Sequence, residues 1–303
     1  MRIATAQYQS NMNQSLQLNQ ERLSKLTQQM AEGKRLLLPS DDPVDSVRLS
    51  RLQREEAAIT QYRDNIATVK IRLTRTEGYL GSMVNDIAAG RDLIVWALDG
   101  ANTPDDLKAM ISPLESLRDS LLYSANSVDQ DGAYVFSGTK TSIAPMSFDE
   151  NAPLGERYQF AGNLNEQQVV VGNGLTQVAN DNMSGMEKLL NSIDQTIETL
   201  RSGKLNVNEP ATRAVLAANL KGFDDGLDMI SGKIAVLGGK QNILDTLDAN
   251  HGNVSLSNQM AITDIGQLDM GIAATELNGY STALQATYKA YSRIGSLSLF
   301  SAL

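Results

Sequence analysis

Two long stretches of the chain contain no proline and carry apolar residues at alternating spacings of three and four, the pattern of a coiled-coil seam. In the first stretch the series is apolar apart from Thr76 and the small Gly90. Its members are Ile59, Tyr62, Ile66, Val69, Leu73, Thr76, Leu80, Met83, Ile87, Gly90, Ile94 and Ala97. As one helix from Val44 to Trp96, this stretch would be about 80 Å long at 1.5 Å per residue, which predicts an elongated molecule.

The second stretch follows the helix-start pattern Asn208-Glu209-Pro210. Its series is Leu216, Leu220, Phe223, Leu227, Ile230, Ile234, Leu237, Gln241, Leu244, Asp248 and His251. Between the two stretches, a capping residue followed by proline occurs at Thr103 and again at Ser112, so each position predicts a helix start. A shorter seam follows at Leu114, Leu117, Leu121, Ser124 and Val128. This segment is predicted to fold back on the first long helix as an antiparallel hairpin.

The periodicity changes at Asp131, where β-favouring residues stand between glycines. The predicted strands cover residues 134–136, 158–160 and 169–171, and the insertion ends near Ser184. Residues 186–201 are again amphipathic and predict a helix before the loop at 202–209. The sequence therefore predicts a helical bundle interrupted by a small β-rich insertion.

Both ends of the chain carry narrow heptad seams surrounded by Gln, Asn, Ser and Thr. The N-terminal seam is Met12, Leu16, Leu23, Leu26 and Met30, with polar Asn19 in register. The C-terminal seam is Met270, Ala273, Leu277, Tyr280, Leu284, Thr287, Tyr291 and Ile294. Such narrow seams are marginal for an isolated helix in water, so we expect both ends to be disordered in the monomer and to fold on assembly.

The fold class predicted from these patterns is mainly α: an elongated helical bundle or coiled coil with a small β-rich insertion. The predicted segments are an N-terminal assembly segment (1–43), two halves of a helical core (44–130 and 186–260) around the insertion (131–185), and a C-terminal assembly segment (261–303).

Composition narrows the function. The chain of 303 residues has a net charge of −9, so no basic field favours nucleic acid, and no apolar run is long enough to insert into a membrane. It has no cysteine and one histidine, which removes thiolate chemistry and His-rich metal sites. The N-terminal residues lack an apolar signal sequence, so we expect no cleaved signal peptide. We predict no catalytic, cofactor or metal-binding residues.

Four local motifs have structural explanations. Gly172-Asn173-Gly174 lacks the third glycine of a dinucleotide loop and predicts a hairpin turn. Gly238-Gly239-Lys240 lacks the hydroxyl residue of a phosphate loop. Asp42 precedes Pro43 and is predicted to cap a helix, in preference to forming an acid/base pair with Asp41. His251 occupies a seam position and is predicted to be structural.

The run from Gln28 to Arg35, followed by Pro39-Ser40-Asp41-Asp42-Pro43, resembles the N-terminal motif of the flagellin family. The aspartate-aspartate-proline sequence and the run from Gly132 to Thr139 are similar to the junction-type members of that family in particular. Near the other end, residues 282–286 and 296–300 are similar to the family's C-terminal segment. The resemblance covers about the first 140 and last 45 residues.

The resemblance implies a non-enzymatic subunit of the bacterial flagellum, exported by the flagellar type III system. It implies contact with hook-associated protein 1 on the hook side, flagellin on the filament side, further copies in a ring or helical layer, and an export chaperone at the C-terminal segment. In this family the two terminal segments pair as a coiled coil. The residues predicted to form the assembly interface are Met12, Leu16, Leu23, Leu26, Met30, Met270, Leu277, Tyr280, Leu284, Tyr291, Ile294, Leu297, Leu299 and Phe300.

Three other functions can be compared with the same sequence patterns. A flagellin filament subunit would share the same terminal segments, and a cytoplasmic coiled-coil scaffold would share the seams but would have ordered ends in the free protein. A hydrolase would need a cleft with paired titrating groups, which the sequence does not suggest.

Overall fold

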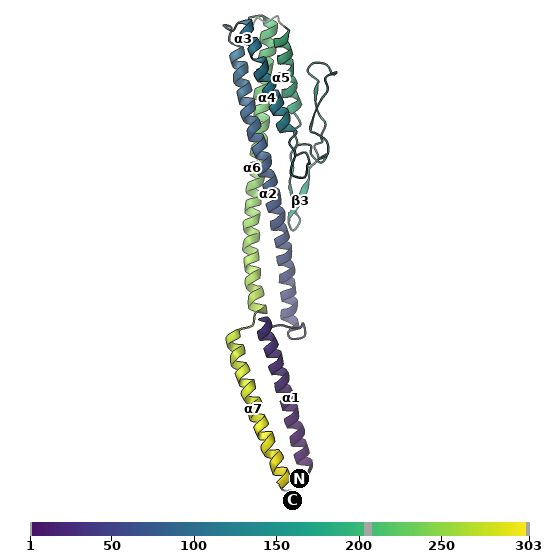
Figure 1. The fold of residues 1–303 in the computed structure, drawn as a ribbon, viewed down its shortest axis with the longest axis vertical. Helices are drawn as coiled ribbons and strands as arrows, with labels where there is room; N and C mark the ends of the chain where they lie inside the picture. Colours follow the sequence, from purple (N-terminus) through teal and green to yellow (C-terminus); the bar gives the residue numbers. More distant parts are fainter. Residues whose placement is uncertain (1, 203–207, 301–303) are drawn as a thin grey trace. The chain divides into compact units, whose positions relative to one another are not determined.

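The computed structural model describes residues 2–202 and 208–300, with side chains described for 7–202 and 208–293. The chain divides into two compact units: unit 1 comprises Met1–Thr60 and Gly252–Leu303, and unit 2 comprises Gln61–His251. The helices in Figure 1 are α1 (Arg2–Glu32), α2 (Pro43–Ala97), α3 (Pro104–Ala109), α4 (Ile111–Ala125), α5 (Met186–Arg201), α6 (Pro210–Gly266) and α7 (Met270–Phe300). The strands are β1 (Met146–Phe148), β2 (Tyr158–Phe160), β3 (Gln168–Gly172) and β4 (Leu175–Val178). The mainly α fold with a small β-rich insertion is confirmed.

Unit 2 is built on the predicted seam of α2. Every seam position from Ile66 to Ala97 is buried, and Tyr62 is half-buried. The α6 helix runs antiparallel to α2, since Arg63 near one end of the pair bonds Asp248 at 2.8 Å and Arg91 near the other bonds Asp224 at 2.6 Å. Side chains repeating every three and four residues on facing helices therefore form one continuous core, as the sequence predicts.

Gly90 lies at the closest approach in this core. A Cβ at this position would lie 2.4 Å from Cε1 of Phe223 and 3.0 Å from Cδ1 of Leu117. Ser120 on α4 also donates a hydrogen bond to Asp86 on α2. The short helix α4 thus packs antiparallel to α2 in the predicted hairpin, and glycine is needed where the phenylalanine ring enters.

The local start signals give mixed results. Thr103 forms the predicted capping box with Asp106, and α5 has the predicted bounds. The helix predicted to start at Ser112 is present as α4, but it begins at Ile111 and has no side-chain cap, so the capping role of Ser112 was wrong. Val128 also lies beyond the end of α4 and is exposed, so it is no part of that helix's seam.

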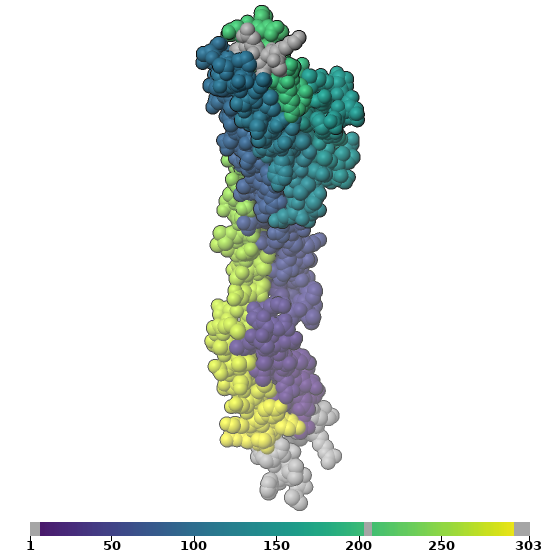
Figure 2. All heavy atoms as spheres, turned by 45° about the horizontal axis from the view of Figure 1, so that its top comes forward, coloured from purple at the N-terminus to yellow at the C-terminus, as the bar shows by residue number. Residues whose placement is uncertain are grey.

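The β-rich insertion contains two separate antiparallel hairpins, β1 with β2 and β3 with β4. The predicted turn between β3 and β4 is confirmed, with Gly174 at a φ of +70°. Residues 134–136 were wrongly predicted as a strand: Val135 donates to the Ser127 carbonyl while the Phe136 carbonyl accepts from Met183, so this backbone is bonded to loops. Phe136 is nevertheless fully buried, and Figure 2 shows the insertion in teal against the helices of unit 2.

Candidate assembly interface

The two ends of the chain pair with each other in unit 1. Helices α1 and α7 lie side by side, purple and yellow in Figures 1 and 2. Gln20 on α1 donates a hydrogen bond of 2.9 Å to the hydroxyl of Tyr288 on α7. Among the described side chains of this pair, the buried apolar ones are Leu26, Ala273 and Leu284, at 5%, 1% and 8% exposure. A two-helix pair thus closes on a single narrow stripe.

The structure places the predicted interface residues at three levels of exposure. Leu26 and Leu284 are buried, whereas Met270 and Tyr291 are exposed. The half-buried group is Met12, Leu16, Leu23, Met30, Leu277 and Tyr280. The side chains of Ile294, Leu297, Leu299 and Phe300 lie outside the described residues. Within the chain alone, most of the predicted seam therefore retains surface that another subunit could cover.

The motif at the end of α1 forms a compact junction with the connection between α6 and α7. Gly33 has a φ of +68°, and the amide of Lys34 bonds the carbonyl of Gln29, as in a Schellman helix end. The amide of Arg35 then donates to the Gly266 carbonyl at 2.8 Å, and the amide of Leu268 to the Gly33 carbonyl at 3.1 Å. The glycine thus turns the chain so that backbone from both ends meets.

The paired aspartates stabilise this junction in different ways. Asp42 accepts the amides of Val44 and Asp45 and caps α2, as predicted. Asp41 accepts from Lys25 at 2.6 Å and from the amides of Leu37 and Leu38. The hydrogen bond from Lys25, followed by that from the Leu38 amide, lowers the pKa of Asp41 to about 2.

Arg35 is a functional candidate that the sequence reasoning missed. Its guanidinium bonds the Asp45 carboxylate and the carbonyl of Ile265, at 2.9 Å from Nε, so one side chain joins the start of α2 to the end of α6. The signal in the sequence was a basic residue directly before an apolar loop and a helix with an acid in its first turn.

A buried polar layer between α2 and α6 in unit 1 was also missed. Glu56 accepts hydrogen bonds from Ser255 and Gln259. Its second oxygen, Oε2, and the buried Nδ2 of Asn258 have no hydrogen-bond partner among the described residues. The signal was a pair of polar residues, Ser255 and Asn258, at spacing three where the α6 seam continues past His251.

His251 has a structural role in unit 2. Its Nε2 lies 2.8 Å from the carbonyl of Val171 in strand β3, and its ring lies 5.6 Å from that of Tyr62. The histidine therefore attaches a β-hairpin to the long helices.

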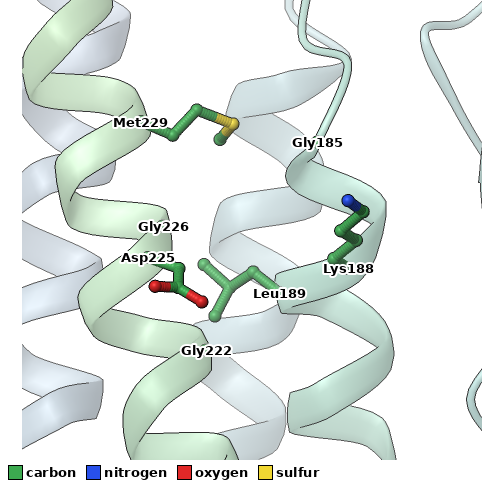
Figure 3. A pocket seen from close by; sticks show the side chains of 7 residues that line it. All are labelled: Gly185, Lys188, Leu189, Gly222, Asp225, Gly226 and Met229. Atoms are coloured by element: carbon green, nitrogen blue, oxygen red, sulfur yellow. The ribbon is translucent and has the colours of Figure 1, made fainter.

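Figure 3 shows a groove of about 250 Å³ between α5 and α6 in unit 2. Gly222 and Gly226 form part of its wall, and a Cβ on Gly226 would lie 2.9 Å from Cδ2 of Leu189. The charged residues among those that line it are Lys188 and Asp225. The glycines allow the two helices to pack closely. The described residues that line the groove include no pair of titrating groups of the kind that acid–base catalysis uses.

Within the ranges 2–202 and 208–300, no group of three or more His, Cys, Asp or Glu side chains is placed to hold a metal ion. None of the helices described for this chain combines the length and the apolar character that a membrane span requires.

The chain is similar to several known flagellar proteins. Residues 3–141 match the bacterial flagellin N-terminal helical region. A flagellar hook-associated protein 3 of Escherichia coli is 28% identical over 317 aligned residues, which cover 99% of both chains. A solved flagellar hook-associated protein of Vibrio parahaemolyticus is 33% identical, with a TM-score of 0.68 over 75% of this chain and 100% of that one.

A flagellar junction protein of Legionella pneumophila is 14% identical with a TM-score of 0.60, over 73% of this chain and 100% of that one, and shares the fold. The similarity to the Escherichia coli protein extends over the whole sequence, and that to the Vibrio protein over three quarters of it. The chain therefore belongs to the flagellar hook-associated protein family, and its residues 3–141 match the N-terminal helical region of the flagellins.

Proposed function

We propose that this protein is a structural subunit of the bacterial flagellum that joins the hook-side hook-associated protein to the flagellin filament. The observation that carries the proposal is similarity over 99% of the chain to a flagellar hook-associated protein 3. The pairing of α1 with α7, which brings both chain ends into one unit, supports assembly through those ends.

The assembly mechanism follows from the narrow seam of the α1–α7 pair. Exposed Met270 and Tyr291 and half-buried Leu16 and Leu277 would lose further surface against neighbouring copies. Burial stabilises by about 25 cal/mol per Å² of apolar surface, which offsets the entropy of ordering two marginal helices. The terminal segments 1–43 and 261–303 would then be disordered in the monomer and ordered in the assembled layer.

The partners would be hook-associated protein 1 on one side, flagellin on the other, and further copies of this chain in a ring or helical layer. An export chaperone would cover the C-terminal segment before assembly. Loose ends suit passage through the flagellar type III channel to the outside of the cell. The role we propose is structural, and it assigns no enzymatic activity to the chain.

Deletion of the coding sequence, with electron microscopy of the cells and an assay for flagellin in the medium, tests this function. Bare hooks with flagellin released into the medium are expected, because filament subunits would be exported with nothing to build on. Bare hooks without released flagellin would identify the chain as the filament subunit itself, and intact filaments would favour a cytoplasmic scaffold.

A further inference from the structure

The α2–α6 pair in unit 1 has two uncovered edges. The α2 edge consists of Val47, Arg51 and Arg54, all exposed, with Val47 at 62%. The α6 edge consists of Leu256, Met260 and Asp264, also exposed, with Met260 at 62%. Each edge thus combines exposed apolar surface with charge, and the charge has opposite sign on the two edges.

Helical periodicity places these edges on opposite sides of the pair. Leu49 and Glu56 on α2 contact α6. A residue two positions from such a contact projects about 200° away, so Val47, Arg51 and Arg54 point outward. On α6 the buried Asn258 and the half-buried Ile262 lie on the inner side. Met260 and Asp264 each follow one of these residues by two positions, so they point outward.

The two edges also lie at the same level along the pair. Cδ1 of Leu49 lies 3.6 Å from where a Cβ of Gly266 would stand, and Glu56 bonds Ser255. Interpolating between these two contacts sets Arg51 level with residue 263, one residue from Asp264. Two copies placed side by side without an axial shift would therefore bring Arg51 of one next to Asp264 of the other.

Two charges on these edges, Arg51 and Asp264, are not paired within the described part of the chain. Neither Arg51 nor Asp264 has an ion pair within 4.0 Å among the described residues, although Glu55 follows Arg51 by one turn. The neighbouring junction charges are paired within the chain, as in Lys25–Asp41 and Arg35–Asp45. An arginine beside exposed apolar side chains is typical of an interface hot spot.

We infer that the α2 edge of one copy docks on the α6 edge of a second copy at the same level, with Arg51 paired to Asp264. The occupant is a second copy because this chain itself supplies the opposite charge at the same level. Since the two edges differ, the contact is heterologous and generates a ring or a helix. The inference rests on the proposed function and specifies how neighbouring copies meet in the layer.

A charge-swap series in the deletion strain tests the contact. We expect Arg51→Glu and Asp264→Arg each to abolish attached filaments while this chain and flagellin are still exported into the medium. The double variant Arg51→Glu/Asp264→Arg should restore filaments, because the pair is re-formed with reversed polarity. Arg213→Glu, an exposed arginine of α6 in unit 2, is the matched control and should leave filaments intact.

Filaments in both single variants, or no rescue by the double variant, would overturn the contact and leave the junction function standing. The function fails independently if the deletion strain itself keeps its filaments. Because the chain has no cysteine, a second readout is available in isolated flagella. Arg51→Cys/Asp264→Cys should form cross-linked multimers with a short thiol cross-linker, whereas Gln53→Cys/Asp264→Cys, with Gln53 on another side of α2, should not.

Discussion

Units 1 and 2 use the same kind of helix but differ in how much of their apolar surface they bury. All members of the contiguous core cluster, from Ile66 to Leu244, belong to unit 2. In unit 1 the buried apolar residues among those described are Leu26, Ile59, Ile265, Ala273 and Leu284. We therefore expect unit 2 to be stable through its own core, and unit 1 to need apolar surface that a neighbouring copy would cover.

The two units also differ in net charge. Unit 1 has 10 basic and 10 acidic residues, while unit 2 has 16 basic and 25 acidic residues. Copies that approach through unit 1 meet no net repulsion, whereas copies that approach through unit 2 meet like charge. Close contact between copies is therefore favoured at unit 1.

Limited proteolysis of the free chain should give the largest contrast between the units. We expect a protease to remove roughly the first 40 and last 40 residues, because marginal helices open readily, and to spare residues 61–251. Mass spectrometry of the fragments measures the boundaries. Resistance of both ends would contradict folding on assembly.

Removing a large aromatic side chain from the core of unit 2 should strongly destabilise that unit. Phe223 is fully buried against Gly90, so Phe223→Ala should lower the free energy of unfolding by about 3–5 kcal/mol. Urea denaturation followed by circular dichroism measures the loss. An unchanged midpoint would mean that unit 2 is not held by this core.

A charge in the apolar stripe between α1 and α7 should disturb unit 1 and leave the stability of unit 2 unchanged. Leu284 is 8% exposed, so Leu284→Asp places a carboxylate in an apolar contact and prevents the pairing of the ends. We expect the urea midpoint of unit 2 to be unchanged and attached filaments to be absent. Exposed Thr282→Asp on the same helix is the control, and normal filaments with Leu284→Asp would argue against the pair as the assembly element.

The pKa of Asp41 should report on whether the junction at the end of α1 is ordered, through the smallest of the expected effects. In a free chain with loose ends, its pKa should be near its ordinary 3.8; in an ordered junction it should be about 2, because Lys25 and the Leu38 amide bond the carboxylate. A lowered pKa means that the junction gains stability above pH 4 and loses it as the pH falls through 2. Carbon-13 NMR of labelled aspartate measures the midpoint.

In the double variant Gln20→Cys/Tyr288→Cys, cross-linking with a short thiol reagent should order the junction and lower the pKa of Asp41. Lys25→Met in the cross-linked chain should move it up again. A midpoint of about 2 in the uncrosslinked free chain would show that unit 1 is already ordered in the monomer.

The fold was predictable where one physical pattern dominates. The seam of α2 was predicted from spacing alone, because burial follows helical periodicity from Ile66 to Ala97. Strands β1 and β4 were missed, because short hairpins are specified by pairing partners more than by their own residues. Residues 134–136 have strand-like composition, but tertiary hydrogen bonds to Ser127 and Met183 hold them as a loop.

The candidate interface was predictable as a set of seams but not as a set of contacts. Heptad spacing predicted Leu26 and Leu284, the two buried members of the set. It gave no indication of Arg35 or the Glu56 layer, because their partners lie about 200 residues away in the sequence. Long-range polar contacts leave no periodic trace.

Unit 1 is discontinuous in the sequence, and this sets an order of events during synthesis. Residues 1–60 leave the ribosome first, but their partners at 252–303 emerge only after all of unit 2 has been made. The folding of residues 61–251 brings the two ends of unit 2 together and so lowers the entropy lost when the terminal helices meet. Unit 1, which forms the proposed contact between copies, is therefore the last part of each chain that can fold.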